Sequence, residues 1–305
     1  MSDKRIVAER DPVLPLVSIG IPTFNRPEGL RRTLEQICAQ TYPRLEIIVS
    51  DNASTDPMVE EIGRRFAEED ARVTYIRQQA NIGAMPNFKH VLRCATGQYF
   101  MWAADDDEWS PYFVERCLAN SRDGESVACK FDTLFRYTGH RETNPVPALD
   151  PDKGQLANLQ AFFGLMQPSL IYGLHQRKTL DFFADLPNFD FVDCYFVLRQ
   201  ILGPGLRTIP DVLYTAGVDA ATYEIKYSDA KSKKFDYAPF YLRTAWLVLR
   251  TRKLGIREKY DALKALKQTI FGLIRHHEGC DDPQPILRAQ VKRYWRRMFV
   301  PDFVV

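Results

Sequence analysis

The chain has 305 residues, of which 45% are hydrophobic and 12% aromatic, a composition that excludes global disorder and allows one large domain or two small ones. The formal net charge is only +2, yet residues 243–297 contain fourteen Lys and Arg against five Asp and Glu. The remaining 27 basic and 34 acidic residues give the rest of the chain a net charge of −7. We therefore expect the basic C-terminal region to meet an anionic surface.

The six cysteines show no metal-ligand spacing such as Cys-x-x-Cys. Cys38, Cys94 and Cys117 fall within apolar helical patterns, which favours buried free thiols over disulfides. The charged segment 1–11 lacks the apolar core of a secretory signal, and no window reaches the ~18–20 apolar residues of a membrane span. These features predict a cytoplasmic protein, either free or peripheral on the cytosolic face of a membrane.

Four apolar, β-rich runs near the N-terminus are each followed by a segment with helical spacing. The runs are 16–24, 45–51, 72–78 and 97–104. The first helix opens at Pro27, and the fourth opens at Ser110, whose hydroxyl can cap it. Alternating strands and helices predict an α/β fold with a mainly parallel sheet covered by helices on both faces.

The chain is less regular up to about residue 235 and then becomes mainly helical. Strands are predicted at 126–137, 168–174, 207–210 and 211–217, and helices at 156–166, 176–186 and 191–202. A polar, proline-rich connection covers 139–154. Long helical patterns at 245–255, 259–277 and 285–299 predict a helical C-terminal extension.

Three successive carboxylates, Asp105, Asp106 and Asp107, occupy the turn after the fourth predicted strand. Open α/β sheets bind ligands at the carboxyl ends of their strands, so this turn lies where a ligand is expected. Adjacent carboxylates repel one another unless a cation or hydrogen-bond donors offset their charge. A hard divalent metal that holds a phosphorylated substrate is one explanation, and an acidic surface turn is the other.

Polar residues also end the other three strands. Thr23 and Asn25 follow the first strand, Asp51 ends the second, and Asn81 and Gly83 follow the third. Because the carboxyl ends of parallel strands share an edge, these residues and the acidic turn are expected to line one cleft. Each alone is ordinary turn chemistry, but their common position favours a ligand site.

Three segments carry a resemblance to a known family, namely VSIGIPTFNRPEGLRRTLEQICAQTYPRLEIIVSDNASTD, NIGAMPNF and YFMWAADDDEWSP. In this combination and order, the chain resembles the inverting family 2 glycosyltransferases, which have the nucleotide-binding, Rossmann-like GT-A fold. The resemblance covers residues 14–120 and continues more weakly to about 217. It implies a catalytic domain over 1–235, with a nucleotide-sugar half at 14–120 and an acceptor half at 121–235. A basic, amphipathic helical region over 236–305 follows.

The resemblance assigns roles to the strand ends. The implied nucleotide-sugar residues are Pro22, Thr23, Asn25, Arg26, Asp51, Asn81, Gly83, Asn87, Asp105 and Asp106. The family's Asp-x-Asp motif implies that Asp105 and Asp107 hold Mn²⁺ or Mg²⁺, and three successive acids leave the register open, with Asp106 as the alternative. Such a metal would neutralise the two phosphates of the leaving nucleoside diphosphate.

A general base for the acceptor hydroxyl is implied farther along the chain. The family's pattern of an aspartate followed by an arginine and a glycine matches Asp193 and Arg199, and Asp190 is the reserve. The alternative for Asp193 is a helix N-terminal charge that the helix dipole favours. The Arg or His that many relatives carry after the last core strand is missing here, so pyrophosphate contacts are expected from His175, Lys226 or another basic group. The alternative for His175, which we favour, is a hydrogen-bonded surface residue.

The resemblance implies metal-dependent, inverting transfer of a sugar from a nucleotide-sugar, most commonly a UDP-sugar, to a hydroxyl. The implied acceptor is a cell-surface glycan or a lipid-linked acceptor, as in polysaccharide or lipopolysaccharide biosynthesis. A nucleotidyltransferase is an alternative, but PTFNRPEGLRR lacks the glycine-rich basic loop expected after the first strand. A noncatalytic sugar-nucleotide-binding protein is the other alternative.

The basic C-terminal region has two possible roles. The leucines and isoleucines of 259–277 form one apolar face, which either lies on a membrane or packs on the catalytic body. In 291–300, Tyr294 and Trp295 stand among four cations, a composition typical of contact with an anionic membrane surface. No DNA- or RNA-binding motif accompanies the charge, so no nucleic-acid partner is expected.

Overall fold

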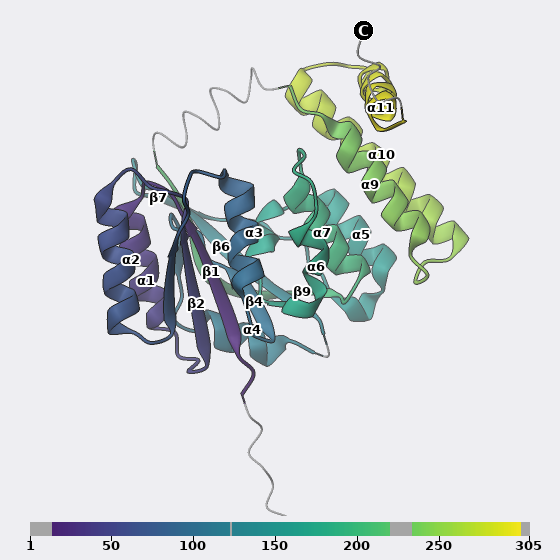
Figure 1. The fold of residues 1–305 in the computed structure, drawn as a ribbon. Helices are drawn as coiled ribbons and strands as arrows, with labels where there is room; N and C mark the ends of the chain where they lie inside the picture. Colours follow the sequence, from purple (N-terminus) through teal and green to yellow (C-terminus); the bar gives the residue numbers. More distant parts are fainter. Residues whose placement is uncertain (1–13, 123, 220–233, 300–305) are drawn as a thin grey trace, which may run out of the picture.

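The structure is a computed structural model that describes residues 14–122, 124–219 and 234–299. The charged N-terminal segment and Lys226 lie outside these described residues, so the expectations that rest on them stay predictions. In the last helix, side chains are described as far as Trp295. A sheet with flanking helices forms one side of the molecule, and a mainly helical part forms the other (Figure 1).

The first sheet confirms the predicted parallel core. Its strands are β1 (Val17–Thr23), β2 (Leu45–Asp51), β3 (Val73–Arg77), β4 (Tyr99–Trp102) and β8 (His175–Gln176). The spatial order is β3-β2-β1-β4-β8, in which the first four strands are parallel and β8 is antiparallel to β4. The predicted runs at 16–24, 45–51 and 72–78 match β1 to β3 within a residue or two at each end.

Helices cover both faces of this sheet, as the alternating pattern predicted. They are α1 (Pro27–Cys38), α2 (Pro57–Glu69), α3 (Ala84–Cys94) and α4 (Phe113–Asn120). Side chains of α1, α2 and α4 share one buried cluster with Ile19 and Ile47, whereas α3 belongs to a second cluster with Phe100. A Cβ at Gly20 would lie 2.6 Å from Val91 of α3, so glycine in β1 allows the helix to pack directly on the strand.

A second, smaller sheet lies beside the first and was only partly predicted. Its order is β5-β9-β6-β7, with β5 (Glu108–Trp109), β9 (Leu206–Val218), β6 (Ser126–Phe135) and β7 (His140–Thr143). The two strands predicted at 207–210 and 211–217 are one continuous strand, and β7 lies in the segment predicted as a connection. β6 and β9 are parallel. Their register shifts on both sides of Lys130, where β9 contains extra residues that have no partner in β6.

The helix expected to open at Ser110 begins later. Glu108 and Trp109 instead pair with β9, and the Ser110 amide donates to the Leu213 carbonyl at 2.9 Å. The Ser110 hydroxyl accepts the amide hydrogen of Tyr112, so it shapes a turn before α4 and does not cap the helix. Sheet pairing, which the local sequence does not report, therefore overrides the local capping signal.

Two other predicted elements have a different form. The strand-like segment 168–174 is largely the 3-10 helix η2 (Pro168–Tyr172), and the predicted helix at 176–186 divides into three short elements. These are β8, the 3-10 helix η3 (Arg177–Thr179) and α6 (Asp181–Ala184). The division follows from the Arg177 amide, which donates to the Gln98 carbonyl and so holds the start of the segment against the sheet.

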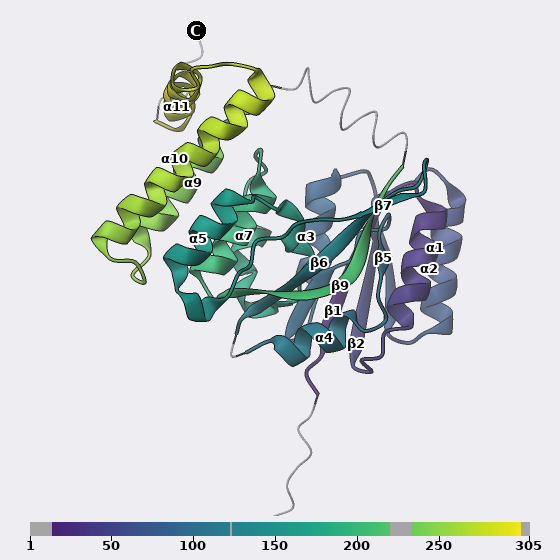
Figure 2. The same ribbon diagram turned by 180° about the vertical axis from the view of Figure 1, so that it is seen from behind.

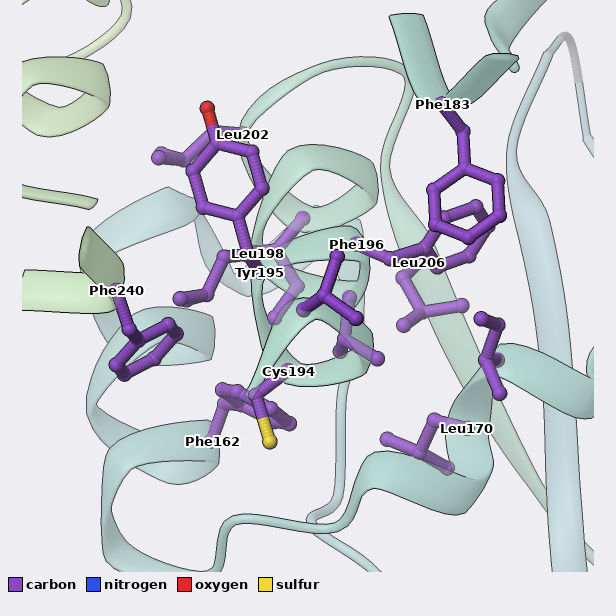
Figure 3. Close-up of a cluster of buried hydrophobic side chains, with 14 of the residues drawn as sticks. Phe162, Leu170, Phe183, Cys194, Tyr195, Phe196, Leu198, Leu202, Leu206 and Phe240 are labelled. Atoms are coloured by element: carbon purple, nitrogen blue, oxygen red, sulfur yellow. The ribbon is translucent and has the colours of Figure 1, made fainter. Parts of the chain in front are cut away.

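The helical part is built around α7 (Val192–Leu202), close to the helix predicted at 191–202. It also contains the 3-10 turn η1 (Pro151–Lys153) and α5 (Gln155–Gly164). Figure 3 shows α7 surrounded by Phe162 of α5, Leu170 of η2, Phe183 of α6 and Phe240. A helix that is apolar on every side belongs in a core, and nine of the eleven residues of α7 are buried.

Three C-terminal helices lie along the outer side of this part (Figures 1 and 2). They are α9 (Tyr237–Arg250), α10 (Ile256–Glu278) and α11 (Gln284–Phe299). The apolar face of α10 packs on α5 and α9, and it includes the fully buried Leu266, Ile270 and Ile274. Of the two roles considered for this face, membrane contact or packing on the body, the structure thus shows packing. Among the described residues, no helix combines the length and apolarity needed to span a bilayer. All six cysteines are free thiols, and of the three expected to be buried, Cys117 is buried while Cys38 and Cys94 are only partly buried.

Candidate active site

The carboxyl ends of β1, β2 and β4 meet at one edge of the first sheet. The parallel register pairs Thr23 with Asp51. Backbone hydrogen bonds continue beyond the strands, from the Asn52 amide to the Thr23 carbonyl and from the Ala103 amide to the Gly20 carbonyl, each at 2.9 Å. The predicted convergence of the strand ends is therefore confirmed, and the acidic turn after β4 lies at that edge.

The acidic turn folds back onto the end of β1. The Thr23 hydroxyl donates to Asp105 Oδ2 at 2.7 Å. Nη1 of the half-exposed Arg26 lies 3.1 Å from Asp105 Oδ1 and 2.7 Å from Asp106 Oδ2. Burial nevertheless raises the pKa of Asp105 to about 6, although Arg26 and Thr23 oppose this shift. The protein thus compensates the negative charge of the turn only in part.

Asp107 connects the turn to the second sheet. Its Oδ1 accepts a hydrogen bond from the Gly217 amide of β9 at 3.0 Å, and Arg136 Nη2 donates to the Asp106 carbonyl at 3.0 Å. A Cβ at Gly217 would lie 2.0 Å from that carbonyl oxygen, so this close approach requires glycine. The turn is therefore fixed between the end of β1 and the end of β9. Neither Arg136 nor Gly217 was identified from the sequence, because no local pattern connects either to the turn.

A cavity of about 400 Å³ opens beside the turn, and we call it the strand-end cavity. It is lined by Pro22, Thr23, Phe24, Arg26, Asn52, Asn81, Gly83, Ala84, Asn87, Phe88 and Asp105. Seven of these residues were implied by the family resemblance, and Phe24, Asn52, Ala84 and Phe88 were not. Gly83 precedes α3 with φ of +89°, a conformation that favours glycine, and so brings the anion-favouring N-terminus of the helix to the cavity.

Asp51 is fully buried and is not among the residues that line the strand-end cavity. Its Oδ1 accepts the Ser54 amide hydrogen at 2.8 Å, and its Oδ2 accepts from the Tyr75 hydroxyl at 2.7 Å and from Arg77 Nη1 at 2.8 Å. These contacts fix the loop that follows β2. The implied contact between Asp51 and the nucleotide-sugar stays a prediction.

Asn52, next to Asp51, occupies the cavity wall. Its Nδ2 donates to Asn81 Oδ1 at 2.9 Å, and its Oδ1 accepts the Ile82 amide hydrogen at 2.8 Å. Its only signal in the sequence was its place after a strand-end aspartate. Asn25 also joins two loops, since its Oδ1 accepts the Thr55 amide hydrogen at 2.7 Å, whereas Asn87 of α3 bonds the backbone and side chain of Ser50 in β2. Asparagine side chains thus join the elements around the cavity.

Asp193 lies in the first turn of α7, where its Oδ1 accepts the Cys194 amide hydrogen at 2.7 Å. Phe191, which precedes the helix, has φ of +67°, a left-handed conformation that is uncommon for a bulky residue. Burial raises the pKa of Asp193 above its usual range, and the hydrogen bond from Cys194 opposes the shift. A carboxylate with a raised pKa is suited to accept a proton near neutral pH.

Tyr172, at the end of η2, lies near both acidic elements. Burial raises the pKa of its phenol well above the usual range, and the carboxylates of Asp107, Asp106 and Asp193 add to the shift. Both acidic elements therefore act on the charge state of the same buried ring, while Asp105 lines the strand-end cavity and Asp193 lines a different one.

The reserve base and the arginine of the predicted motif have other contacts. Asp190 Oδ2 accepts the Asp236 amide hydrogen at 2.9 Å and so joins the segment before α7 to the start of α9. The Arg199 guanidinium lies over the Phe182 ring, 4.3 Å from its centroid. This packing role accounts for Arg199 without any contact to a substrate.

His175 is fully buried between Trp102 and Phe196, and its Nε2 lies 2.9 Å from the Ile171 carbonyl oxygen. Burial lowers its pKa to about 4, so the ring is neutral at physiological pH. Its burial excludes the predicted contact to a pyrophosphate. The charged group of the cavity wall that is suited to that contact is Arg26.

The donor atoms of the acidic turn determine which metal site it fits. Within the described ranges, no group of three or more His, Cys, Asp or Glu side chains is arranged to hold a metal ion. Mg²⁺ at phosphate sites is commonly held by only one or two carboxylates together with phosphate oxygens of the substrate. The buried and partly compensated Asp105, with Asp107 in the same turn, fits a site of that kind.

Comparison with known sequences gives the following similarities. The profile described as "Glycosyl transferase family 2" matches residues 18–199. The chain is 34% identical over 109 residues to the putative colanic acid biosynthesis glycosyl transferase WcaA of Escherichia coli K12, over 35% of this chain and 38% of that protein. It is 37% identical over 201 residues to an uncharacterised Mycobacterium tuberculosis protein, over 65% of this chain and 57% of that protein. The matched regions thus cover less than two thirds of either relative.

Solved structures share the fold. A Staphylococcus aureus TarS fragment in complex with UDP-GlcNAc superposes with a TM-score of 0.69 at 16% identity, over 92% of this chain and 81% of that one. The mannosyltransferase PcManGT from Pyrobaculum calidifontis, in complex with GDP-Man and Mn²⁺, gives a TM-score of 0.52 at 19% identity, over 95% and 82%. At these identities, the similarity establishes the architecture alone.

Proposed function

Because the chain belongs to glycosyl transferase family 2 and has the GT-A type of α/β fold, we propose that it transfers a sugar from a nucleotide-sugar, first of all a UDP-sugar, to a hydroxyl with inversion at the anomeric carbon. The proposed acceptor is a cell-surface glycan or a lipid-linked precursor of one. The observation that carries the proposal is the strand-end cavity, whose wall includes Asp105 of the acidic turn held by Thr23 and Arg26.

The strand-end cavity supports the proposed donor site. Its volume of about 400 Å³ lies in the range of small-ligand pockets. Phe24 and Phe88 offer apolar surfaces to a nucleobase, and Asn52 and Asn81 offer hydrogen-bonding groups. The diphosphate lies toward Arg26, whose guanidinium is half-exposed and already near the acidic turn.

A divalent metal, Mn²⁺ or Mg²⁺, supplies positive charge to the donor diphosphate when it is bound. The carboxylates that would hold it are Asp105 and Asp107, with Asp106 as the alternative. Support for this choice comes from the hydrogen bonds of Asp107 to β9 and of Asp105 to β1, which fix the orientation of both carboxylates in the turn.

Asp193 is the proposed general base. The acceptor oxygen attacks the anomeric carbon on the face opposite the nucleotide, and a new carbon–oxygen bond forms while the bond to the phosphate oxygen breaks. The electron pair of that bond leaves with the nucleoside diphosphate, and the hydroxyl proton passes to the Asp193 carboxylate. The buried helix α7 holds this carboxylate in place, and its raised pKa strengthens it as a proton acceptor.

The variant Asp193→Asn tests the proposal because it keeps the size of the side chain and removes the base. We expect transfer to fall about a thousandfold while nucleotide binding is unchanged. A thermal-shift screen of nucleoside diphosphates and nucleotide-sugars with and without Mn²⁺ first identifies the donor. Nucleoside diphosphate release in the presence of glycan acceptors then measures transfer.

Asp185→Asn is the matched control, since this aspartate shortly before α7 has a 94% exposed side chain. It is expected to transfer at the wild-type rate. Wild-type transfer by Asp193→Asn would show that another group is the base, and the same assay on Asp190→Asn would then identify or exclude the reserve residue. Loss of nucleotide binding in Asp193→Asn would instead show a structural role.

We further propose that the C-terminal region holds the enzyme on an anionic membrane surface. Four exposed side chains at the turn between α9 and α10 support this, and we call them the hairpin patch: Trp246, Leu249, Ile256 and Tyr260. Exposed cations surround them, among them Arg250, whose guanidinium lies 5.1 Å from the Trp246 ring centroid. Aromatic and aliphatic groups among cations suit the interface of an anionic bilayer.

A further inference from the structure

A second cavity, of about 840 Å³, lies between the start of α7 and the C-terminal helices, and we call it the interhelical cavity. Asp193 forms part of its wall. The facing walls come from Pro239 of α9, Leu273 and His277 of α10 and Tyr294 of α11. Any molecule whose hydroxyl reaches the Asp193 carboxylate through this cavity therefore also contacts the C-terminal helices.

Aromatic rings form one side of the interhelical cavity. Phe235 and His277 are stacked with ring centroids 4.5 Å apart, and Phe191 lies 5.5 Å from Phe235. The Tyr237 hydroxyl is 2.9 Å from His277 Nδ1, which fixes the orientation of the imidazole. Pyranose rings present C–H faces that pack against such aromatic surfaces.

The charges of the lining residues select against an anion. Asp190, Asp193 and Asp236 contribute carboxylates, and no Lys or Arg belongs to the lining among the described residues. Burial lowers the pKa of His277, with His276 adding to the shift and Glu278 opposing it, so the imidazole is neutral at pH 7.

Two cations lie outside the lining but near it. Arg293 is 3.9 Å from Asp236, and the Arg243 guanidinium is 5.3 Å from the Phe189 ring centroid. Arg293 thus lies beside a lining carboxylate, whereas Arg243 packs on an aromatic ring and its buried Nε has no hydrogen-bond partner within the described part of the chain. Hydroxyl groups donate hydrogen bonds to carboxylates, whereas an anionic group would be repelled by them.

We infer that the interhelical cavity is an acceptor subsite for an uncharged sugar unit, and that His277 and Tyr294 of the C-terminal helices determine which acceptor binds there. This inference rests on the proposed function, because Asp193 gives the cavity its place in the reaction. The family profile ends at residue 199, so α10 and α11 add a wall that the profile does not describe.

The test compares glycosides that differ in one group. Methyl β-glucoside and methyl β-galactoside are each paired with the corresponding methyl uronide, in which a carboxylate replaces the hydroxymethyl group. Saturation-transfer difference NMR on the full chain, with UDP present, measures their binding. We expect both neutral glycosides to bind about fivefold or more tighter than their uronides, because the lining carboxylates repel the added charge.

The variants His277→Ala and Tyr294→Ala are each expected to weaken binding of the neutral glycosides by about fivefold, the effect of one lost hydrogen bond or ring contact. His276→Ala is the matched control, since this neighbouring histidine is exposed and does not line the cavity, and it should bind as the wild type does. Thermal unfolding of each variant reports whether the helices stay packed, and Tyr294→Ala leaves the aromatic stack of His277 intact.

Equal or tighter binding of the uronides, no binding of the neutral glycosides, or wild-type binding by both variants would overturn the inference. The donor measurements separate this failure from failure of the proposed function. If the protein binds the nucleotide and Asp193→Asn loses transfer, but both His277→Ala and Tyr294→Ala bind the glycosides as the wild type does, only the acceptor subsite is wrong. If glycosides bind as expected but no nucleotide-sugar is used, the subsite exists and the proposed reaction is wrong.

Discussion

The strand-end cavity and the interhelical cavity are built by different means. The first is formed by turns at the ends of parallel strands, where hydrogen bonds from Asn52 and Asn81 join neighbouring loops. The second is formed by apolar packing among helices from distant parts of the chain, with polar groups such as Asp193 at helix starts.

This difference indicates how the enzyme separates its two tasks. The family profile covers the sheet edge and ends within α7, while the wall that faces Asp193 belongs to α9, α10 and α11. The part that recognises the proposed donor therefore lies within the common region of the family. The wall that faces Asp193 across the proposed acceptor cavity lies outside it.

His175 provides the strongest test of how firmly the two parts are joined. It belongs to β8 of the sheet, yet its ring packs on Phe196 of α7. Burial lowers its folded-state pKa to about 4, below the usual 6.5, so the unfolded chain binds the proton first as pH falls. As the pH falls from 6.5 to 4, protonation of His175 in the unfolded chain therefore lowers the free energy of unfolding by about 3 kcal/mol in total.

Chemical denaturation at several pH values measures this contribution. His175→Gln cannot titrate, so its free energy of unfolding should fall less steeply than that of the wild type across this pH range. His276→Gln, at an exposed position, should keep the wild-type slope. Parallel curves for His175→Gln and the wild type would show that His175 is not buried in the neutral form at the junction.

The acidic turn gives a smaller effect that is confined to the donor side. Asp107→Ala is expected to weaken Mn²⁺-dependent binding of the donor nucleotide by about a hundredfold, because one of two proposed metal carboxylates is lost. Isothermal titration with the nucleoside diphosphate, with and without Mn²⁺, measures the change. Glycoside binding in the interhelical cavity should be unaffected, since Asp107 does not line it.

Asp106→Ala is the matched variant in the same turn. Its carboxylate pairs with Arg26, so we expect less than a tenfold loss of Mn²⁺-dependent binding, the usual effect of one partly exposed ion pair. A larger loss in Asp106→Ala than in Asp107→Ala would assign the metal to the other register. Unchanged Mn²⁺-dependent binding in Asp107→Ala would remove Asp107 from the metal site.

The sheet side of the molecule was predictable because its signals are local. Each buried strand is a continuous apolar run, and the residues that follow it, such as Asn81 and Gly83, line the strand-end cavity as the sequence indicated. Asp51 shows the limit of this reasoning, because its contacts with Tyr75 and Arg77 turn it away from the cavity. Position at a strand end predicts the edge but not the direction of a side chain.

The second sheet and the interhelical cavity depend on contacts that are distant in sequence. Glu108 and Trp109 form a strand only because β9 pairs with them, and the capping signal at Ser110 is overridden for the same reason. His277 and Tyr294 carried no signal beyond helical spacing and basic composition. Their place opposite Asp193 follows from the packing of α9 on α7 and of α10 and α11 on α9, which no single segment encodes.

The hairpin patch gives the smallest expected effect and tests whether the helical side has a second task beyond the acceptor wall. Replacing Trp246 and Ile256 together by Ser removes two exposed apolar groups, and we expect partitioning onto vesicles with phosphatidylglycerol to fall about tenfold. Vesicle sedimentation measures it, with phosphatidylcholine vesicles as the uncharged reference. Removal of residues 284–305 tests the last helix, which the sequence favoured, in the same assay.

Trp295→Ser is the matched control, because Trp295 is 51% exposed on α11 and stands among cations like those of the hairpin patch. If the last helix is the contact, this variant and the truncation lose binding while the double variant keeps it. If the hairpin patch is the contact, the double variant loses vesicle binding, while Trp295→Ser and the truncation keep it. Glycoside binding by the double variant should stay at the wild-type level, because neither Trp246 nor Ile256 lines the interhelical cavity. The membrane would then meet the turn between α9 and α10, leaving the wall formed by His277 and Tyr294 open to the acceptor.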